Sequence, residues 1–160
     1  MFRRFVLGVI VGVIVGVLSV TALAAQGAPA PAQQAAAAPT TRVFASDGGM
    51  VLNFIKADKT ADFEAIVAKL KEALQKSTKP ERKQQAASWK VFKSPDPAAG
   101  GNILYVFMID PSVKGADYTV STILAEAFPQ EVQALYKQYA DSYASGQNFV
   151  NLQMVSDLSK

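Results

Sequence analysis

The chain contains no cysteine and no histidine. Without cysteine it has no disulfide, no thiol nucleophile and no zinc–thiolate centre. Without histidine it lacks the commonest general base near neutral pH, the commonest transition-metal ligand and the usual haem ligand. We therefore expect no metal site and no cofactor, and the sequence assigns no catalytic residue.

Charge gives no reason to expect a nucleic-acid partner. The sequence has 16 Lys and Arg against 13 Asp and Glu, a formal net charge of +3, and Arg3 and Arg4 supply most of the excess. It also has no glycine-rich phosphate loop after a strand, no nucleophile elbow and no pair of carboxylates at a meaningful spacing. The sequence therefore contains none of these motifs by which an enzyme class could be recognised.

The N-terminus has the pattern of an export signal. Arg3 and Arg4 precede residues 6–20, which are almost entirely apolar, and an Ala-Leu-Ala sequence then ends at Ala24. A basic start, an apolar core and small residues at the cleavage positions are typical of a secretory signal peptide. The pattern predicts a signal peptide over residues 1–24.

The alternative interpretation is an uncleaved membrane anchor. Residues 5–25 are long and apolar enough for a transmembrane helix. Gly8, Gly12 and Gly16 would give that helix a face suited to close contact with a second helix. Under both interpretations the rest of the chain crosses the cytoplasmic membrane, and the protein is periplasmic, secreted or tethered to the membrane with its domain outside.

A low-complexity stretch separates this segment from the rest of the chain. Residues 25–41 consist mainly of Ala, Pro and Gln and contain no charged or aromatic residue. Such a composition cannot bury enough apolar surface to fold, so we expect a flexible linker. The folded domain should then occupy residues 42–160.

Residues 103–109 predict a strand that is buried on both faces. The run is entirely apolar or aromatic, rich in strand-forming side chains and too short for an ordinary buried helix. Because successive side chains of a strand point to opposite faces, a run without polar residues needs cover on both. We expect this strand to lie in the interior of its sheet.

The remaining elements predict an α+β domain. Strands are expected at residues 50–56, 88–93 and 148–155, the second of them followed by a turn at Pro95 and Pro97. Helices are expected at residues 61–76, 119–127 and 129–144, with a short helical turn at residues 81–87. The order β-α-β-β-α-β is that of a ferredoxin-like fold, in which two helical regions cover one face of a four-stranded antiparallel sheet.

This fold leaves one sheet face without helices. Because residues 103–109 are apolar on both faces, the second face needs a cover of its own, and a monomer would expose an apolar patch that soluble proteins rarely tolerate. The sheet of a second copy is the simplest cover. We therefore expect a homodimer whose two sheets form an eight-stranded α+β barrel.

The order of elements and the placement of aromatic residues resemble the dimeric α+β barrel proteins, specifically the antibiotic biosynthesis monooxygenase-like group. The residues that carry this resemblance are Phe54, the Ser88-Trp89-Lys90-Val91-Phe92 segment and the Leu104-Tyr105-Val106-Phe107 segment. The resemblance covers residues 50–155. It implies a dimer with a pocket between sheet and helices in each subunit. Some members of the group oxidise polycyclic phenols without a cofactor, using Asn and Trp near the pocket, and others degrade haem with a His ligand. Asn53 and Trp89 correspond by residue type, whereas the His is missing.

Three residues are candidates for a ligand pocket. Asn53 interrupts an apolar strand and is suited to holding a ligand carbonyl or enolate. Trp89 is the only tryptophan and is a candidate for a pocket wall or a dimer seam, but we favour ordinary core packing for it. Tyr105 lies within residues 103–109 and needs a partner for its hydroxyl if buried.

Two other groups of residues have simpler interpretations. The four tyrosines that follow Tyr105 are expected in the core or an interface; they are Tyr118, Tyr136, Tyr139 and Tyr143. Residues 69–93 are rich in Lys and Arg and would suit an anionic partner. We favour the simpler interpretation, a solvated helix face whose lysines serve solubility.

These observations support three hypotheses for function. The first is a dimeric binding or interaction module that takes a small apolar or aromatic molecule. The second is a cofactor-independent monooxygenase or isomerase of the type that the resemblance implies. The third is a structural envelope protein, tethered to the membrane through residues 5–25.

Overall fold

A computed structural model of the protein describes residues 42–159. The predicted signal peptide or anchor, residues 1–24, and the predicted linker, residues 25–41, lie outside the described residues. Among residues 42–159 no helix has the length and apolarity needed to cross a bilayer.

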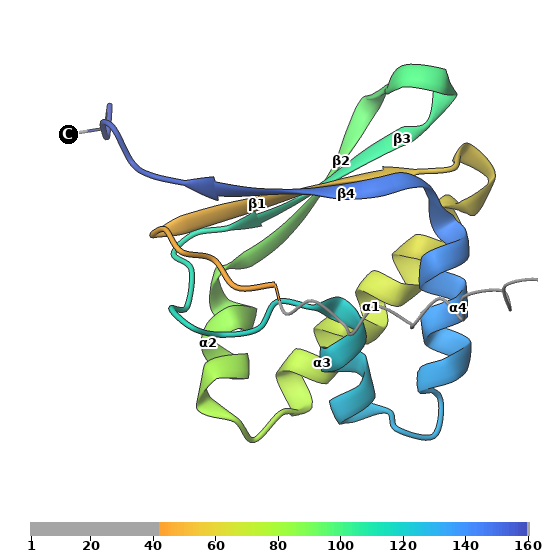
Figure 1. Cartoon of the computed structure of the whole chain (residues 1–160), viewed down its shortest axis with the longest axis horizontal. Coiled ribbons are helices and arrows are strands. Elements are labelled where there is room, and N and C mark those ends of the chain that lie inside the picture. The colour runs from red at the N-terminus through yellow and green to blue at the C-terminus, as the bar shows by residue number, and fades with distance from the viewer. Residues whose placement is uncertain (1–41, 160) are drawn as a thin grey trace, which may run out of the picture. The chain divides into compact units, whose positions relative to one another are not determined.

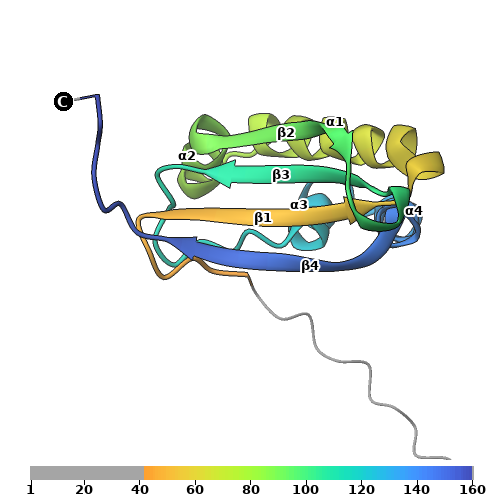
Figure 2. The same ribbon diagram turned by 90° about the horizontal axis from the view of Figure 1, so that it is seen from above.

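The domain contains one four-stranded sheet in the order β2-β3-β1-β4. Its strands are β1 (Gly48–Ile55), β2 (Trp89–Pro97), β3 (Ile103–Ile109) and β4 (Tyr143–Leu152). Neighbouring strands run antiparallel, and Val51 of β1 lies opposite Phe107 of β3 and Phe149 of β4. The prediction that β3 lies in the interior is confirmed (Figure 2).

Four helices lie on one face of this sheet (Figure 1). They are α1 (Thr60–Lys76), α2 (Pro80–Ser88), α3 (Val120–Ala127) and α4 (Val132–Ser142), with short 3-10 turns η1 (Ala57–Lys59) and η2 (Ala99–Gly101). Each crossover between parallel-running strands therefore carries two helices. The architecture is α+β with an antiparallel sheet, as predicted, and its strand order is compatible with a ferredoxin-like fold.

The boundary between α4 and β4 differs from the prediction. The expected helix over residues 129–144 ends at Ser142, and Tyr143 already has extended backbone angles and begins β4. The reason is a tertiary contact, because Tyr143 pairs with Ile55 of β1. The helical spacing of the tyrosines assigns Tyr143 to the helix, but this strand pairing places it in the sheet.

Strand β2 is longer than predicted. It extends to Pro97, which lies opposite Ile103 of β3, so Pro95 and Pro97 belong to a strand and not to a turn. The proline nitrogen cannot donate a ladder hydrogen bond, but β2 forms an edge of the sheet, where a missing donor is tolerated.

The core lies between the sheet and α1, and Phe63 is at its centre. Phe63 of α1 is completely buried. Its ring centroid lies 4.8 Å from that of Tyr105, 5.9 Å from that of Tyr143 and 6.1 Å from that of Tyr139. One helix side chain therefore contacts residues of β3, β4 and α4, and it ties the sheet to two helices.

The opposite face of the sheet has no such cover. Because side chains alternate along a strand and the buried residues Val51, Asn53 and Tyr105 face the helices, the intervening residues project to the other side. They are almost all apolar, and among the described residues no helix lies over them (Figure 1). We call this set the open face: Met50, Leu52, Phe54, Lys90, Phe92, Leu104, Val106, Met108, Asn148, Val150 and Leu152.

We predict that Phe63→Ala lowers the free energy of unfolding by about 3–5 kcal/mol, because it removes a fully buried ring and leaves a cavity. Urea unfolding followed by circular dichroism measures the change. The matched apolar control is Leu158→Ala, since Leu158 is 94% exposed and its removal should leave stability unchanged. Equal effects of the two substitutions would contradict this description of the core.

Candidate functional site

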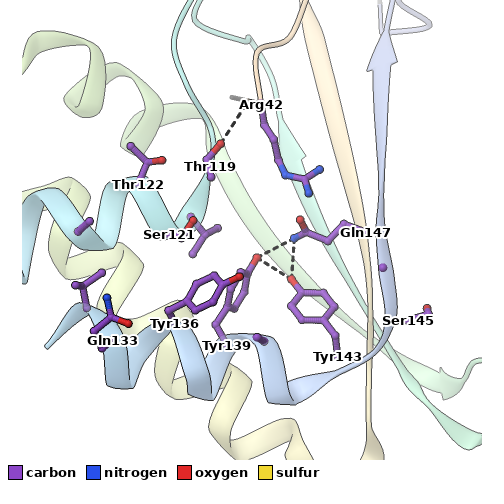
Figure 3. Close-up of a pocket in the computed structure, with 15 residues that line it drawn as sticks. Arg42, Thr119, Ser121, Thr122, Gln133, Tyr136, Tyr139, Tyr143, Ser145 and Gln147 are labelled. Carbon is purple, nitrogen blue, oxygen red and sulfur yellow. Dashed lines mark hydrogen bonds between the residues drawn. The ribbon is translucent and has the colours of Figure 1, made fainter. Parts of the chain in front are cut away.

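Among the well-defined cavities of the domain, the largest lies between α3, α4 and the beginning of β4, beside the chain at Arg42 (Figure 3). Its volume is about 720 Å³. The side chains that give it its chemical character are those of Arg42, Tyr136, Tyr139, Tyr143 and Gln147, with smaller hydroxyl and apolar groups between them. Cavities that hold small molecules are of this size.

The loop that precedes α3 holds Arg42 at the cavity edge through main-chain hydrogen bonds. The Arg42 N–H donates to Asp117 Oδ1 at 3.0 Å and to Thr119 Oγ1 at 3.1 Å, and the Tyr118 N–H donates to the Arg42 carbonyl at 2.7 Å. All three contacts use the backbone of Arg42, so its position does not depend on its guanidinium group.

Asp117 is committed to this loop. Its Oδ1 also accepts hydrogen bonds from the Thr119 N–H at 2.9 Å and the Thr119 hydroxyl at 2.6 Å. Burial has the largest single effect on the pKa of the Asp117 carboxyl and raises it. The hydrogen bonds from Thr119 and Arg42 together outweigh burial, so the pKa lies below its ordinary value. The nearest carboxylate to Arg42 is thus occupied in fixing the backbone.

The inner wall of the cavity is a cluster of hydrogen-bonded side chains from α4, β4 and β1. Gln147 Nε2 lies 2.8 Å from the Tyr139 hydroxyl, 2.7 Å from the Tyr143 hydroxyl and 2.8 Å from Asn53 Oδ1. The Tyr143 hydroxyl lies 2.8 Å from Asn53 Oδ1 and 2.7 Å from the Tyr139 hydroxyl. We call Asn53, Tyr139, Tyr143 and Gln147 the amide–tyrosine cluster.

The phenol hydrogens and the Gln147 amide hydrogens can all be used within the cluster. Gln147 Nε2 has two hydrogens and each phenol has one. If Gln147 donates to Asn53 and Tyr139, then Tyr139 can donate to Tyr143 and Tyr143 to Asn53, which closes the network. Asn53 Nδ2 donates in turn to the Val51 and Tyr105 carbonyls, each at 3.2 Å. Asn53 is therefore completely buried with its hydrogen bonds satisfied.

The phenols of the cluster stay protonated near neutral pH. Burial, above all, raises the pKa of Tyr139 to about 12. Burial and the neighbouring Tyr139 phenol raise the pKa of Tyr143 well above its ordinary value. The described residues that line the cavity include no carboxylate and no lysine. The cavity thus offers neutral hydrogen-bonding groups and one guanidinium, and none of these is a general base at physiological pH.

The three residues that the sequence singles out do not meet at one place. Asn53 lies behind the cavity wall, in contact with Tyr143 and Gln147 of the lining. Trp89 packs against Phe107 and Tyr118, with ring centroids 5.5 and 5.3 Å away.

Trp89 instead lines a second cavity of about 270 Å³ between α1 and β2, with Val67, Leu70 and Leu74. Its Nε1 is buried, and within the described part of the chain it has no hydrogen-bond partner. Tyr105 lines neither of these two cavities. Its hydroxyl donates to Glu64 Oε1 at 2.5 Å, and the Lys93 ammonium lies 5.5 Å from the centre of its ring.

Sequence reasoning alone misses the residues that line the larger cavity. Tyr136, Tyr139 and Tyr143 recur at helical spacing, which favours an interpretation as core or interface. Only Tyr139 is buried, whereas Tyr136 is 55% exposed and forms part of the cavity wall. Gln147 continues the four-residue spacing from Tyr139 and Tyr143, which is an available signal. No local pattern marks Arg42.

The basic stretch of residues 69–93 is largely neutralised by carboxylates. Lys69 pairs with Glu131 at 3.1 Å, and Lys93 pairs with Glu64 at 2.9 Å. Arg82 is only 3% exposed and pairs with Glu126 at 3.0 Å, which joins α2 to α3. Five of the eight basic residues of this stretch thus form ion pairs, four of them between different segments of the domain.

Within residues 42–159 no three acidic side chains gather closely enough to hold a metal ion. Comparison of the chain with protein-family models, with curated proteins and with solved structures finds no match. The function of the domain is therefore inferred from its own geometry.

We predict that the free energy of unfolding falls as pH rises from about 10 to about 12. In the unfolded chain a tyrosine ionises near pH 10, whereas buried Tyr139 keeps its proton to about pH 12, so alkali favours the unfolded state. Each withheld proton contributes a slope of about 1.4 kcal/mol per pH unit. Urea unfolding between pH 9 and 12 measures it. Tyr139→Phe should flatten the fall, and an unchanged slope would contradict the assignment.

Proposed function

We propose that the domain is a small-molecule-binding module whose site is the cavity beside Arg42. The observation that carries the proposal is the cavity itself: about 720 Å³ of space, open to solvent and lined by three tyrosines, small apolar side chains and a few polar groups. Small-molecule sites combine an apolar lining with a few polar groups. The absence of a general base from the described lining favours binding over turnover.

The exposure of Tyr136 supports this proposal. Its side chain is 55% exposed on α4 while the neighbouring Tyr139 is buried. Tyr136 lies in the cavity wall, where a bound molecule would cover its ring (Figure 3). Aromatic rings contribute large apolar area at low entropic cost, which suits them to a site for an apolar or aromatic ligand.

We also propose that two copies pair through the open face and form an eight-stranded barrel. Four strands about 4.8 Å apart and about seven residues long, at about 3.3 Å per residue, span roughly 440 Å² in plan. Two such faces have roughly the 1,000 Å² that a specific interface needs, because protruding side chains add to the plan area. Lys90 is the only charged residue of the open face, so a second copy presents an equally apolar and complementary surface.

The cavity and the open face lie on opposite sides of the sheet. The cavity is formed by α3, α4 and the helix-facing side of β4, whereas the open face carries no helix among the described residues (Figure 1). A dimer formed through the open face would leave both cavities accessible. Export of this module to the periplasm or the cell exterior remains a prediction from residues 1–24.

We predict that Val106→Glu converts the dimer of residues 42–160 into a monomer. Val106 lies between Leu52 of β1 and Phe92 of β2 in the middle of the open face. A carboxylate buried there without a partner costs about 3–5 kcal/mol, which raises the dissociation constant more than about 100-fold. Native mass spectrometry and light scattering measure the mass.

The matched control for this experiment is Gln84→Glu, which adds the same charge to an exposed position on α2. It should leave the dimer intact. A wild-type domain that is monomeric at micromolar concentration would refute the barrel proposal.

We predict that Tyr136→Ala weakens binding of 2-naphthylacetamide, a neutral aromatic probe, about tenfold, because the substitution removes an exposed ring from the cavity wall. Titration of the full-length chain in detergent, followed by NMR, measures the affinity. Lys137→Ala is the control, because Lys137 is the next residue on α4 and pairs with Asp141 outside the cavity. Equal loss in both variants would contradict the site.

A further inference from the structure

We propose that the cavity selects ligands that carry a carboxylate on an aromatic or apolar body, and that the guanidinium of Arg42 is the group that binds the carboxylate. This inference rests on the proposed function and names the ligand class of that site. Three observations support it: the guanidinium has no acidic partner among the described residues, the described lining contains no competing acid, and the lining combines polar groups with apolar side chains.

The Arg42 guanidinium has no acidic partner among the described residues. The carboxylate of Asp117 accepts hydrogen bonds from the Arg42 backbone and from Thr119, and not from the Arg42 guanidinium. The other arginine of the described chain, Arg82, donates to both oxygens of Glu126, at 3.2 and 3.0 Å. Arg42 is half-buried at the cavity edge, and its guanidinium points toward Gln147 (Figure 3). A partly desolvated cation without a counter-ion is suited to receive one from a ligand.

The charge of the described lining is wholly positive. Arg42 is the only Lys, Arg, Asp or Glu in that lining, and the tyrosines contribute neutral hydroxyls. No carboxylate in that lining would repel an anion. A guanidinium matches the two oxygens of a carboxylate with parallel N–H donors, and such charge-assisted bonds are stronger than neutral ones.

The walls on either side of Arg42 define the rest of the ligand. Near the guanidinium lie Gln147 and the hydroxyl ends of the amide–tyrosine cluster (Figure 3). The lining also includes the apolar side chains of Val120 and Val132 and the ring of Tyr136. One guanidinium beside neutral groups suits a singly charged carboxylate, whereas phosphate sites ordinarily gather several donors or cations.

The test compares 2-naphthylacetate with 2-naphthylacetamide, which share a ring system and differ in charge. Both are titrated by NMR against the full-length chain in detergent. We expect the carboxylate to bind at least about tenfold more tightly than the amide. Arg42→Gln should abolish this preference while leaving the amide affinity within about twofold. Because the hydrogen bonds that anchor Arg42 use its backbone, this variant should unfold at the wild-type urea concentration.

Lys83→Gln is the matched control for charge. Lys83 is exposed on α2, away from the cavity lining, and its substitution removes the same single positive charge. The preference for the carboxylate should survive in this variant. If Lys83→Gln reduces the preference as much as Arg42→Gln, the effect is general electrostatic attraction and the role of Arg42 is refuted.

The remaining outcomes separate this inference from the proposed function. Equal binding of the two probes to the wild-type chain, with loss of both in Tyr136→Ala, would refute the carboxylate preference and leave the binding module standing. Failure of both probes to bind at millimolar concentration would refute the proposed site itself. A preference that persists in Arg42→Gln would assign the anion contact to another group.

Discussion

A single buried amide constrains the arrangement of sheet and helices around the cavity. Asn53 lies in a strand whose other helix-facing side chains are apolar, and a buried polar group without partners is costly. Its oxygen is satisfied by Tyr143 and Gln147, and both must therefore reach β1 from β4. Tyr139 then joins the same network from α4. The path of the chain from α4 into β4 is thus coupled to the hydrogen bonds of one residue in the central sheet.

This arrangement gives the cavity a described lining of neutral phenols and amides with one guanidinium. The phenols are held neutral by burial, the amides do not titrate, and the nearest carboxylate is occupied in a loop. Such groups orient a ligand by hydrogen bonds and do not transfer protons at physiological pH. The cofactor-independent oxygenase hypothesis requires Asn53 and Trp89 beside one substrate. In this fold Asn53 contacts the lining of one cavity and Trp89 lines another.

The two sides of the sheet have separate roles in our proposals. The helix-facing side carries the core around Phe63 and the cavity, and the open face provides the surface for a second copy. Separation of this kind would allow dimerisation to stabilise the sheet without occluding the site. It also explains why β3 has no charged or amide side chain on either side: one side contacts α1, and the other contributes to the open face.

The sequence by itself determined the fold class, the interior position of residues 103–109 and the uncovered second face, because these follow from alternation and composition over whole elements. It did not determine where α4 ends, because Tyr139 and Tyr143 keep a helical spacing across the junction and only the pairing of Tyr143 with Ile55 makes that segment a strand.

The site was likewise decided by tertiary structure alone. Tyr136, Tyr143 and Gln147 belong to the continuous α4–β4 segment, whereas Arg42 is far from them in the chain, and the cavity exists only where α3, α4, β4 and the chain at Arg42 converge. Asn53 stands out in the sequence as a polar residue in an apolar strand. In the fold it forms hydrogen bonds with Tyr143 and Gln147 of the cavity wall and does not itself line the cavity. Local sequence specifies which side chains need partners, whereas three-dimensional packing decides which partners they find.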